Sequence, residues 1–218
     1  MFSVWTAKGG AGATTVALGL ATSLARRNGV LLVDLGGDLP AAFGVADPAL
    51  GLTDWLATDD GDSEALGRLE TEIDDRISLL SIGHARTWEP HRDALLVNLL
   101  GADDRLVVID VGCLDREPTN DVARLRLNLV MGGEVSLLVL RPNYLALRRA
   151  HGLGVTPTGV VLVEESARSM SATEVSELIG APVLARVGID DAITRVIDAG
   201  MTRRRLPRPF TKALSGVA

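Results

Sequence analysis

Seven short apolar stretches, rich in β-branched residues, alternate with helical patterns along the chain, and this alternation is the strongest constraint on its fold. Most of the stretches are continuously apolar, as in Val30–Leu35 and Leu106–Val111. Strands have this pattern when helices cover both faces of a parallel sheet. The predicted strands are Phe2–Ala7, Val30–Leu35, Ile77–Ile82, Leu106–Val111, Val135–Arg141, Gly159–Val163 and Val183–Val187.

Helical patterns fill most of the intervals between these strands. Ser171 and Glu174 have the spacing of a capping box at the start of one of them. Strands that alternate with helices predict an α/β fold, a doubly wound and mainly parallel sheet of about seven strands with right-handed crossovers. The predicted helices are Thr14–Arg27, Pro90–Leu100, Thr119–Val130, Tyr144–His151, Ala172–Ile179 and Asp190–Ala199, with a short helix at Leu52–Ala57 and a solvated acidic loop at Asp59–Asp62.

Composition predicts one soluble domain over residues 1–218. Apolar residues make up 47% of the 218 residues, enough for a core that buries about 70% of the unfolded surface. The net charge of −6 shows no basic excess of the kind that indicates nucleic-acid or membrane binding. A single cysteine, with no secretory leader pattern or membrane-spanning apolar run, predicts a cytoplasmic location.

A glycine-rich loop follows the first predicted strand directly and precedes the first helix. Gly9, Gly10 and Gly12 let the backbone bend around an anion and direct its N–H groups toward it. The N-terminus of the following helix adds a partial positive charge. The order of strand, glycine loop, hydroxyl residues and helix therefore predicts an anion site.

These residues resemble a known family. The segment Lys8–Thr15, KGGAGATT, is similar to KGGxGKTT, the deviant phosphate loop of MinD/ParA proteins. The resemblance continues in VLLVD, GLTDWLA, LVVID and GEVSLLVLRPNY and so extends over almost the whole chain. It implies a P-loop NTPase-like fold. Members of this family bind ATP with Mg²⁺, commonly dimerise around it and position other machinery in bacterial cells.

The resemblance also implies roles for single residues. Lys8, one of only two lysines among 22 basic residues, matches the signature lysine that reaches the partner's nucleotide. Lys8 and Asp34 would be the catalytic residues, and Thr14, Asp34 and Asp110 would hold Mg²⁺. The implied nucleotide-binding residues are Gly9, Gly10, Ala11, Gly12, Ala13, Thr14 and Thr15.

Several positions depart from the family pattern. Ala13 replaces the loop lysine that normally holds the β- and γ-phosphates. Gly36 replaces the second aspartate of a D-x-D pair, for which Asp38 would substitute only if the loop bends suitably. Val163 replaces an asparagine that reads adenine, and valine has no group for that task. Two carboxylates that follow this strand, Glu164 and Glu165, are expected at the ligand edge of the sheet, where they would repel ATP.

Three functions remain open. The leading hypothesis is a degenerate MinD/ParA-like protein with weak or absent ATPase activity. It would act as a dimeric localisation or scaffold factor of the CpaE/TadZ-like branch, which recruits a secretion or pilus ATPase. The first alternative is a working ATPase in partitioning or positioning that uses Lys8. The second is a monomeric interaction domain without a ligand.

The remaining candidates are weaker. Cys113 is interpreted as structural, because a catalytic thiol needs a nearby histidine and the three histidines lie in separate segments. The same separation predicts no zinc site. The basic cluster Arg203–Arg205 offers a contact for DNA or anionic membrane, which Arg148 and Arg149 would extend. Pro207 and Pro209 interrupt any helix through that cluster, and a solvated or intramolecularly paired tail is favoured.

Overall fold

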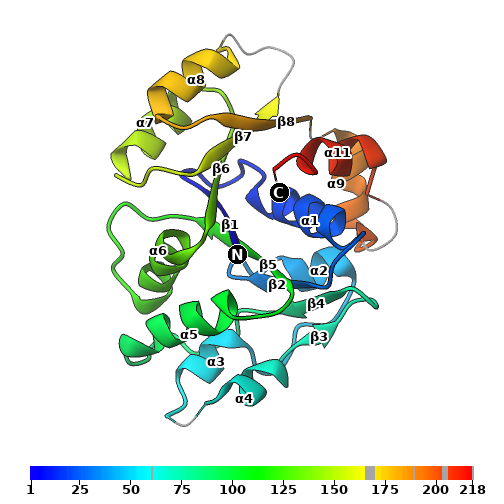
Figure 1. The fold of residues 1–218 in the computed structure, drawn as a ribbon, viewed down its shortest axis with the longest axis vertical. Coiled ribbons are helices and arrows are strands. Elements are labelled where there is room, and N and C mark those ends of the chain that lie inside the picture. Colours follow the sequence, from blue (N-terminus) through cyan, green and yellow to red (C-terminus); the bar gives the residue numbers. More distant parts are fainter. Residues whose placement is uncertain (60, 165–169, 189, 203–205, 218) are drawn as a thin grey trace.

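The protein forms an eight-stranded sheet with helices on both faces (Figure 1). The computed structural model describes residues 1–59, 61–164, 170–188, 190–202 and 206–217. The strand order is β3-β4-β2-β5-β1-β6-β7-β8, and every pair is parallel except β3 with β4. The strands are β1 (Phe2–Thr6), β2 (Val30–Asp34), β3 (Thr71–Glu72), β4 (Ile77–Leu80), β5 (Leu106–Cys113), β6 (Val135–Leu140), β7 (Gly159–Glu164) and β8 (Val183–Gly188).

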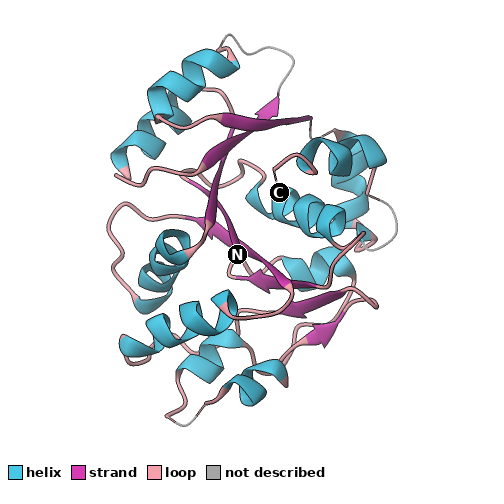
Figure 2. Ribbon diagram, in the orientation of Figure 1, coloured by secondary structure: helices cyan, strands magenta, loops and turns pink. Residues whose placement is uncertain are grey.

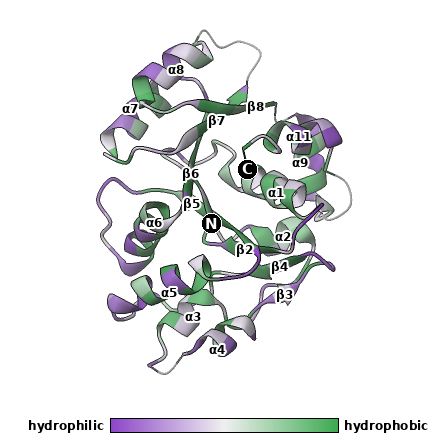
Figure 3. Ribbon diagram, in the orientation of Figure 1, coloured by the Kyte–Doolittle hydropathy of each residue, from purple (hydrophilic) through white to green (hydrophobic). Residues whose placement is uncertain are grey.

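Two hydrophobic clusters lie on opposite faces of the sheet. One joins it to α1, α2, α9 and α11, and the other joins it to the helices from α3 to α8 (Figure 2). Apolar residues line the strands while polar residues gather on the outer sides of the helices (Figure 3). The helices are α1 (Ala13–Leu24), α2 (Leu39–Phe43), α3 (Leu52–Leu56), α4 (Ser63–Gly67), α5 (His91–Gly101), α6 (Asp121–Gly132), α7 (Tyr144–Gly152), α8 (Ala172–Ile179), α9 (Asp191–Asp198) and α11 (Arg208–Leu214).

The predicted α/β architecture is confirmed, and each of the seven predicted strands lies within two residues of its expected bounds. The sheet has one more strand than expected, because the two-residue β3 pairs antiparallel at the edge. Within the described residues, no helix has the length and apolar character needed to cross a membrane.

The acidic loop has more structure than the sequence suggests. Asp59 and Asp62 are exposed as expected, but the Asp62 carboxylate accepts a hydrogen bond from the Ala65 N–H at 2.7 Å and caps α4. The Asp62 carbonyl oxygen also accepts from Trp55 Nε1 at 3.0 Å. This segment is therefore tied to α3, and Asp60 lies outside the described residues.

The C-terminal tail packs against the first helix. Pro209 lies in the first turn of α11, where its missing N–H costs nothing. The prolines therefore accompany the start of a helix that the sequence analysis did not include. Phe210 and Leu214 are buried against α1 at Gly19, where an added Cβ would lie 2.4 Å from the Phe210 ring. The tail is paired within the chain, and Arg203–Arg205 lie outside the described residues.

The predicted capping box is present at the start of α8. Ser171 Oγ accepts from the Glu174 N–H at 3.2 Å, and Glu174 Oε2 accepts from the Ser171 N–H at 2.7 Å. Replacing Ser171 with alanine is expected to lower the free energy of unfolding by about 1 kcal/mol. Urea unfolding followed by circular dichroism measures this change. Thr173→Ala, on the exposed side of the same helix, serves as the control, and an equal loss in both variants would contradict the capping role.

Candidate functional site

The glycine loop joins β1 to α1 in the conformation that an anion site requires. Gly10 and Gly12 have φ angles of 76° and 101°, which are strained for residues with a side chain. Gly12 is the N-cap of α1 and provides no side-chain bond to the first turn. The N–H groups of this turn are therefore available to a ligand.

A cavity of about 460 Å³ lies against this loop. The ends of β1, β2, β5 and β6 meet around it, as expected for the carboxyl edge of a doubly wound sheet. It brings together all seven of the residues that the sequence singled out for nucleotide binding. The lining residues are Thr6, Gly9, Gly10, Ala11, Gly12, Ala13, Thr14, Thr15, Gly36, Asp38, Gly112, Cys113, Arg126, Arg141 and Thr194.

Two predicted site residues differ in their relation to the cavity. Ala13 lines it and is 6% exposed, so the cavity wall carries a methyl group at the position of the family's lysine. Lys8 is half-buried and does not line the cavity of its own chain. Its backbone is fixed by Thr6, whose hydroxyl donates to the Lys8 carbonyl oxygen at 3.1 Å.

Asp34 and Asp110 lie opposite each other on β2 and β5, and both are fully buried. Asp34 Oδ1 accepts from the N–H groups of Gly36 and Gly37 at 2.9 and 2.7 Å, and Oδ2 accepts from that of Leu39 at 3.0 Å. Burial nevertheless raises the pKa of Asp34 above its ordinary value. Asp34 thus fixes the loop after β2, and its catalytic and metal-binding roles stay predictions.

The Asp110 carboxylate accepts fewer hydrogen bonds than that of Asp34. Its Oδ1 accepts from the Gly112 N–H at 3.2 Å, while Oδ2 is buried and has no hydrogen-bond partner among the described residues. Burial, reinforced by the negative charge of Asp34, raises the pKa of Asp110 to about 7, against the opposing effect of the Thr14 hydroxyl. A buried carboxylate oxygen without a partner is costly, and it is a position suited to Mg²⁺ or to a proton.

An aspartate at position 36, as in the family pattern, would lie close to Asp34 and Asp110. A Cβ added at Gly36 would lie 3.2 Å from Asp110 Oδ2 and 3.5 Å from Asp34 Oδ1. A third carboxylate would therefore start beside two buried ones. Asp38, the suggested substitute, is exposed and lines the cavity.

A divalent metal fits this site only in part. Among the described residues, no group of three or more histidine, cysteine or carboxylate side chains is arranged to hold an ion. Mg²⁺ commonly takes one or two protein oxygens together with phosphate oxygens and water. Thr14 and Asp110 would supply the protein oxygens, and the ligand's phosphates would have to supply others.

The expected repulsion by Glu164 is offset. Glu164 Oε1 accepts from Arg186 Nε at 2.6 Å across β7 and β8, so its charge is paired, which the sequence analysis did not anticipate. Glu165 lies outside the described residues. Val163 is buried in β7.

Cys113 follows a bulge in β5. Val4 pairs with Asp110 while Trp5 pairs with Gly112, so one residue of β5 is extra, and Gly112 has a φ of 74°. The bulge places Cys113 on the cavity wall. Burial raises the pKa of the Cys113 thiol, which disfavours the reactive thiolate and agrees with a structural role.

Arg126, Arg141 and Thr194 are cavity residues that the sequence analysis missed. Arg126 extends from α6, and its Nη2 donates to the Leu35 carbonyl oxygen at 2.5 Å. Arg141 follows β6, and Thr194 belongs to α9. The only sequence signal is that Arg141 ends the predicted strand Val135–Arg141, at the edge where ligands bind.

The matched family agrees with this geometry. Residues 2–203 match the model of the CobQ/CobB/MinD/ParA nucleotide binding domain. The chain belongs to this family. No protein with curated annotation matches the chain significantly in sequence.

Solved structures of this family share the fold at low sequence identity. The ParA family ATPase of Chlorobium tepidum TLS is 22% identical with a TM-score of 0.77, over 98% of this chain and 96% of that one. MinD of Pyrococcus horikoshii OT3, complexed with Mg-ADP, is 19% identical with a TM-score of 0.72, over 99% and 93%. MinD in a MinC:MinD complex from Aquifex aeolicus is 14% identical with a TM-score of 0.77, over 99% and 92%.

Proposed function

We propose that this MinD/ParA-family protein has lost efficient ATP hydrolysis and acts as a dimeric localisation or scaffold factor in the cytoplasm, similar to CpaE/TadZ-like proteins of pilus assembly and secretion. The observation that carries the proposal is Ala13. It occupies the lysine position within an otherwise intact glycine-loop cavity, so the loop keeps its shape while its own point charge is absent. A secretion or pilus ATPase would be the partner.

The acidic residues support the loss of turnover. Asp34 has both oxygens engaged by backbone N–H groups, and Gly36 carries no side chain. General-base or water-positioning chemistry needs a carboxylate that points at the reacting water. Asp38 lines the cavity but is exposed, and exposure weakens its control over a water molecule.

Two features on one side of the molecule favour a dimer. Tyr144 and Leu145, at the start of α7, are 72% and 57% exposed. Leu145 also lines a second cavity, of about 540 Å³, which reaches Ala7 and Cys113 next to the glycine loop. Contiguous exposed apolar surface is typical of interaction sites, and Tyr144 and Leu145 are adjacent. Lys8 does not line the glycine-loop cavity of its own chain. This position is consistent with a lysine that contacts the ligand of the partner subunit in a dimer.

A working ATPase is the alternative that a specific observation favours. Thr14 and Asp110 are retained, and Asp110 Oδ2 has no hydrogen-bond partner among the described residues, as a Mg²⁺-dependent site requires. Lys8 would then supply the missing charge in a dimer. The ligand-free monomeric domain is the third possibility, and no observation specifically favours it over the other two.

Restoring the loop lysine tests the proposal. Ala13→Lys is expected to strengthen Mg-ATP binding by about 30-fold, or about 2 kcal/mol, because a charge-assisted contact to phosphate returns. The original chain should release phosphate from ATP no faster than the Lys8→Ala variant. Calorimetry and a phosphate-release assay give the two results. Ala102→Lys, an exposed site beyond α5, controls for added charge.

Size-exclusion chromatography with light scattering completes this test. A dimer that persists without nucleotide supports the scaffold. Rapid Lys8-dependent hydrolysis, with dimers only in the presence of ATP, would establish the working ATPase instead. A monomer that binds no nucleotide would instead support the hypothesis of a ligand-free interaction domain.

A further inference from the structure

Arg126 occupies a central position at the carboxyl edge of the sheet. Its Nη2 is 2.5 Å from the Leu35 carbonyl oxygen, and a Cβ added to Gly112 would lie 4.0 Å from the same atom. Leu35 follows β2, and Gly112 belongs to β5. The guanidinium group therefore lies across the ends of the two strands that carry Asp34 and Asp110, and it lines the glycine-loop cavity.

Much of the hydrogen-bonding capacity of Arg126 is unused. A guanidinium has five N–H donors, whereas Arg126 makes one hydrogen bond to a carbonyl oxygen, and its buried Nε has no partner among the described residues. No carboxylate in the described part of the chain forms an ion pair with it. A partly buried cation without a counter-charge is unfavourable in isolation, so this position favours an anionic ligand.

Arg141 approaches the cavity from a different strand. It directly follows β6, and β1 lies between β5 and β6 in the sheet. The glycine loop continues from β1. Strands on both sides of β1 therefore bring a cation to the cavity wall, one held at the end of β5 and the other following β6. The loop lacks its own lysine but lies between two arginines.

We propose that Arg126 and Arg141 bind the phosphate groups of a nucleoside di- or triphosphate in the glycine loop, in place of the lysine absent at Ala13. Guanidinium groups are permanently charged and bind phosphate oxygens in pairs. The buried Asp110 Oδ2, which lacks a partner among the described residues, independently indicates a cation that would accompany such a ligand. The inference rests on the proposed function in one respect: the cavity still receives a ligand although turnover is lost.

Affinity measurements on arginine variants test this inference. The probes are Mg-ADP, Mg-ATP and pyrophosphate with Mg²⁺, titrated by calorimetry into the full chain. Arg126→Gln and Arg141→Gln should each weaken binding of Mg-ADP by at least about tenfold, and the double variant should bind more weakly still. Arg76→Gln is the matched control, because Arg76 is exposed and precedes β4 at the opposite end of the sheet.

Further measurements separate the role in binding from a role in folding. Arg126 also holds the Leu35 carbonyl oxygen, so urea unfolding of each variant is measured in parallel. Arg126→Lys keeps the charge and should recover part of the affinity, whereas a purely structural role predicts that affinity follows the unfolding midpoint in every variant.

The outcomes distinguish this inference from the proposed function. Unchanged affinity in both glutamine variants overturns the role of the arginines and leaves the scaffold proposal intact. Absence of binding by the original chain to all three probes also overturns the inference, without affecting the scaffold. Rapid ATP turnover by the original chain contradicts the proposed function, whatever the arginine variants show.

Discussion

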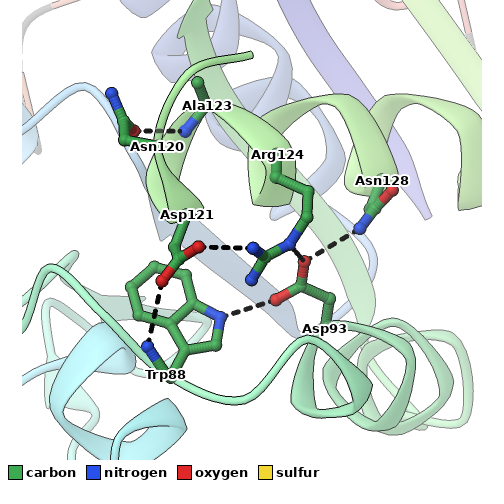
Figure 4. A network of polar contacts seen from close by, with 7 residues as sticks. All are labelled: Trp88, Asp93, Asn120, Asp121, Ala123, Arg124 and Asn128. Atoms are coloured by element: carbon green, nitrogen blue, oxygen red, sulfur yellow. Dashed lines mark hydrogen bonds and ion pairs between the residues drawn. The ribbon is translucent and has the colours of Figure 1, made fainter.

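Replacing Asp93 with alanine is expected to lower the free energy of unfolding by about 3–5 kcal/mol, the cost of breaking a buried ion pair. Asp93 lies on α5 and is 1% exposed. Its Oδ1 accepts from Trp88 Nε1 at 2.6 Å, and its Oδ2 accepts from Arg124 Nε at 2.9 Å and Asn128 Nδ2 at 2.8 Å (Figure 4). The variant leaves three donors without their acceptor and removes one of the two carboxylates that pair with Arg124, the other being Asp121.

Chemical unfolding in urea measures this change. Asp75→Ala, at an exposed aspartate before β4, should change stability by less than about 0.5 kcal/mol. An Asp93→Ala loss as small as that of the control would show that the network contributes little. Because Arg124 and Asn128 are on α6, which also carries Arg126, we expect the same variant to weaken Mg-ADP binding.

Replacing Asp110 with asparagine is expected to stabilise the protein above neutral pH. The pKa of Asp110 is about 7 in the folded protein, raised by burial, while the unfolded chain has the ordinary value near 4. Between these values the folded state holds a proton that the unfolded state has released, so this contribution to stability is present at low pH and is lost as pH rises through 7. The loss amounts to at most about 4 kcal/mol.

Urea unfolding at intervals from pH 4 to pH 8 tests this prediction. The difference in stability between Asp110→Asn and the original chain should grow with pH and level off above 7. Asp47→Asn, at an exposed aspartate, is the control for removing a surface carboxylate, and an equal pH dependence in both variants would contradict the role of burial. A flat difference for Asp110→Asn would mean that its carboxyl is charged throughout.

The order of elements was predictable because a strand that is buried on both faces has a mostly apolar sequence, which can be recognised locally. β1 and β2 are uniformly buried, and apolar residues predominate in both, with Ser3 and Thr6 in β1 and Asp34 at the end of β2 as the exceptions. β3 was not predicted because a strand of two residues is too short to show an alternating or apolar pattern. α2 was not predicted because its five residues include Pro40 and lie between glycines, a pattern that is typical of a turn.

The site was predictable only where its residues are contiguous. Gly9–Thr15 are contiguous, and the order of glycine and hydroxyl residues alone predicts the position of the loop. Arg126 and Arg141 reach the cavity through the packing of α6 and the order of the strands, neither of which is a local property. The Glu164–Arg186 pair joins residues 22 apart in sequence, so the sequence alone predicts that Glu164 repels ATP and does not indicate its partner.

The contact between α1 and α11 has a consequence for how the protein is made. Phe210 and Leu214 cover Gly19 on the first helix, and Thr194 completes the wall of a cavity that begins at Thr6. Domains emerge from the ribosome N-terminus first. The first helix therefore has an uncovered apolar side until Phe210 and Leu214 have been synthesised. A nascent chain that ends before α9 would lack both Thr194 of the cavity wall and the residues of α11 that cover the first helix.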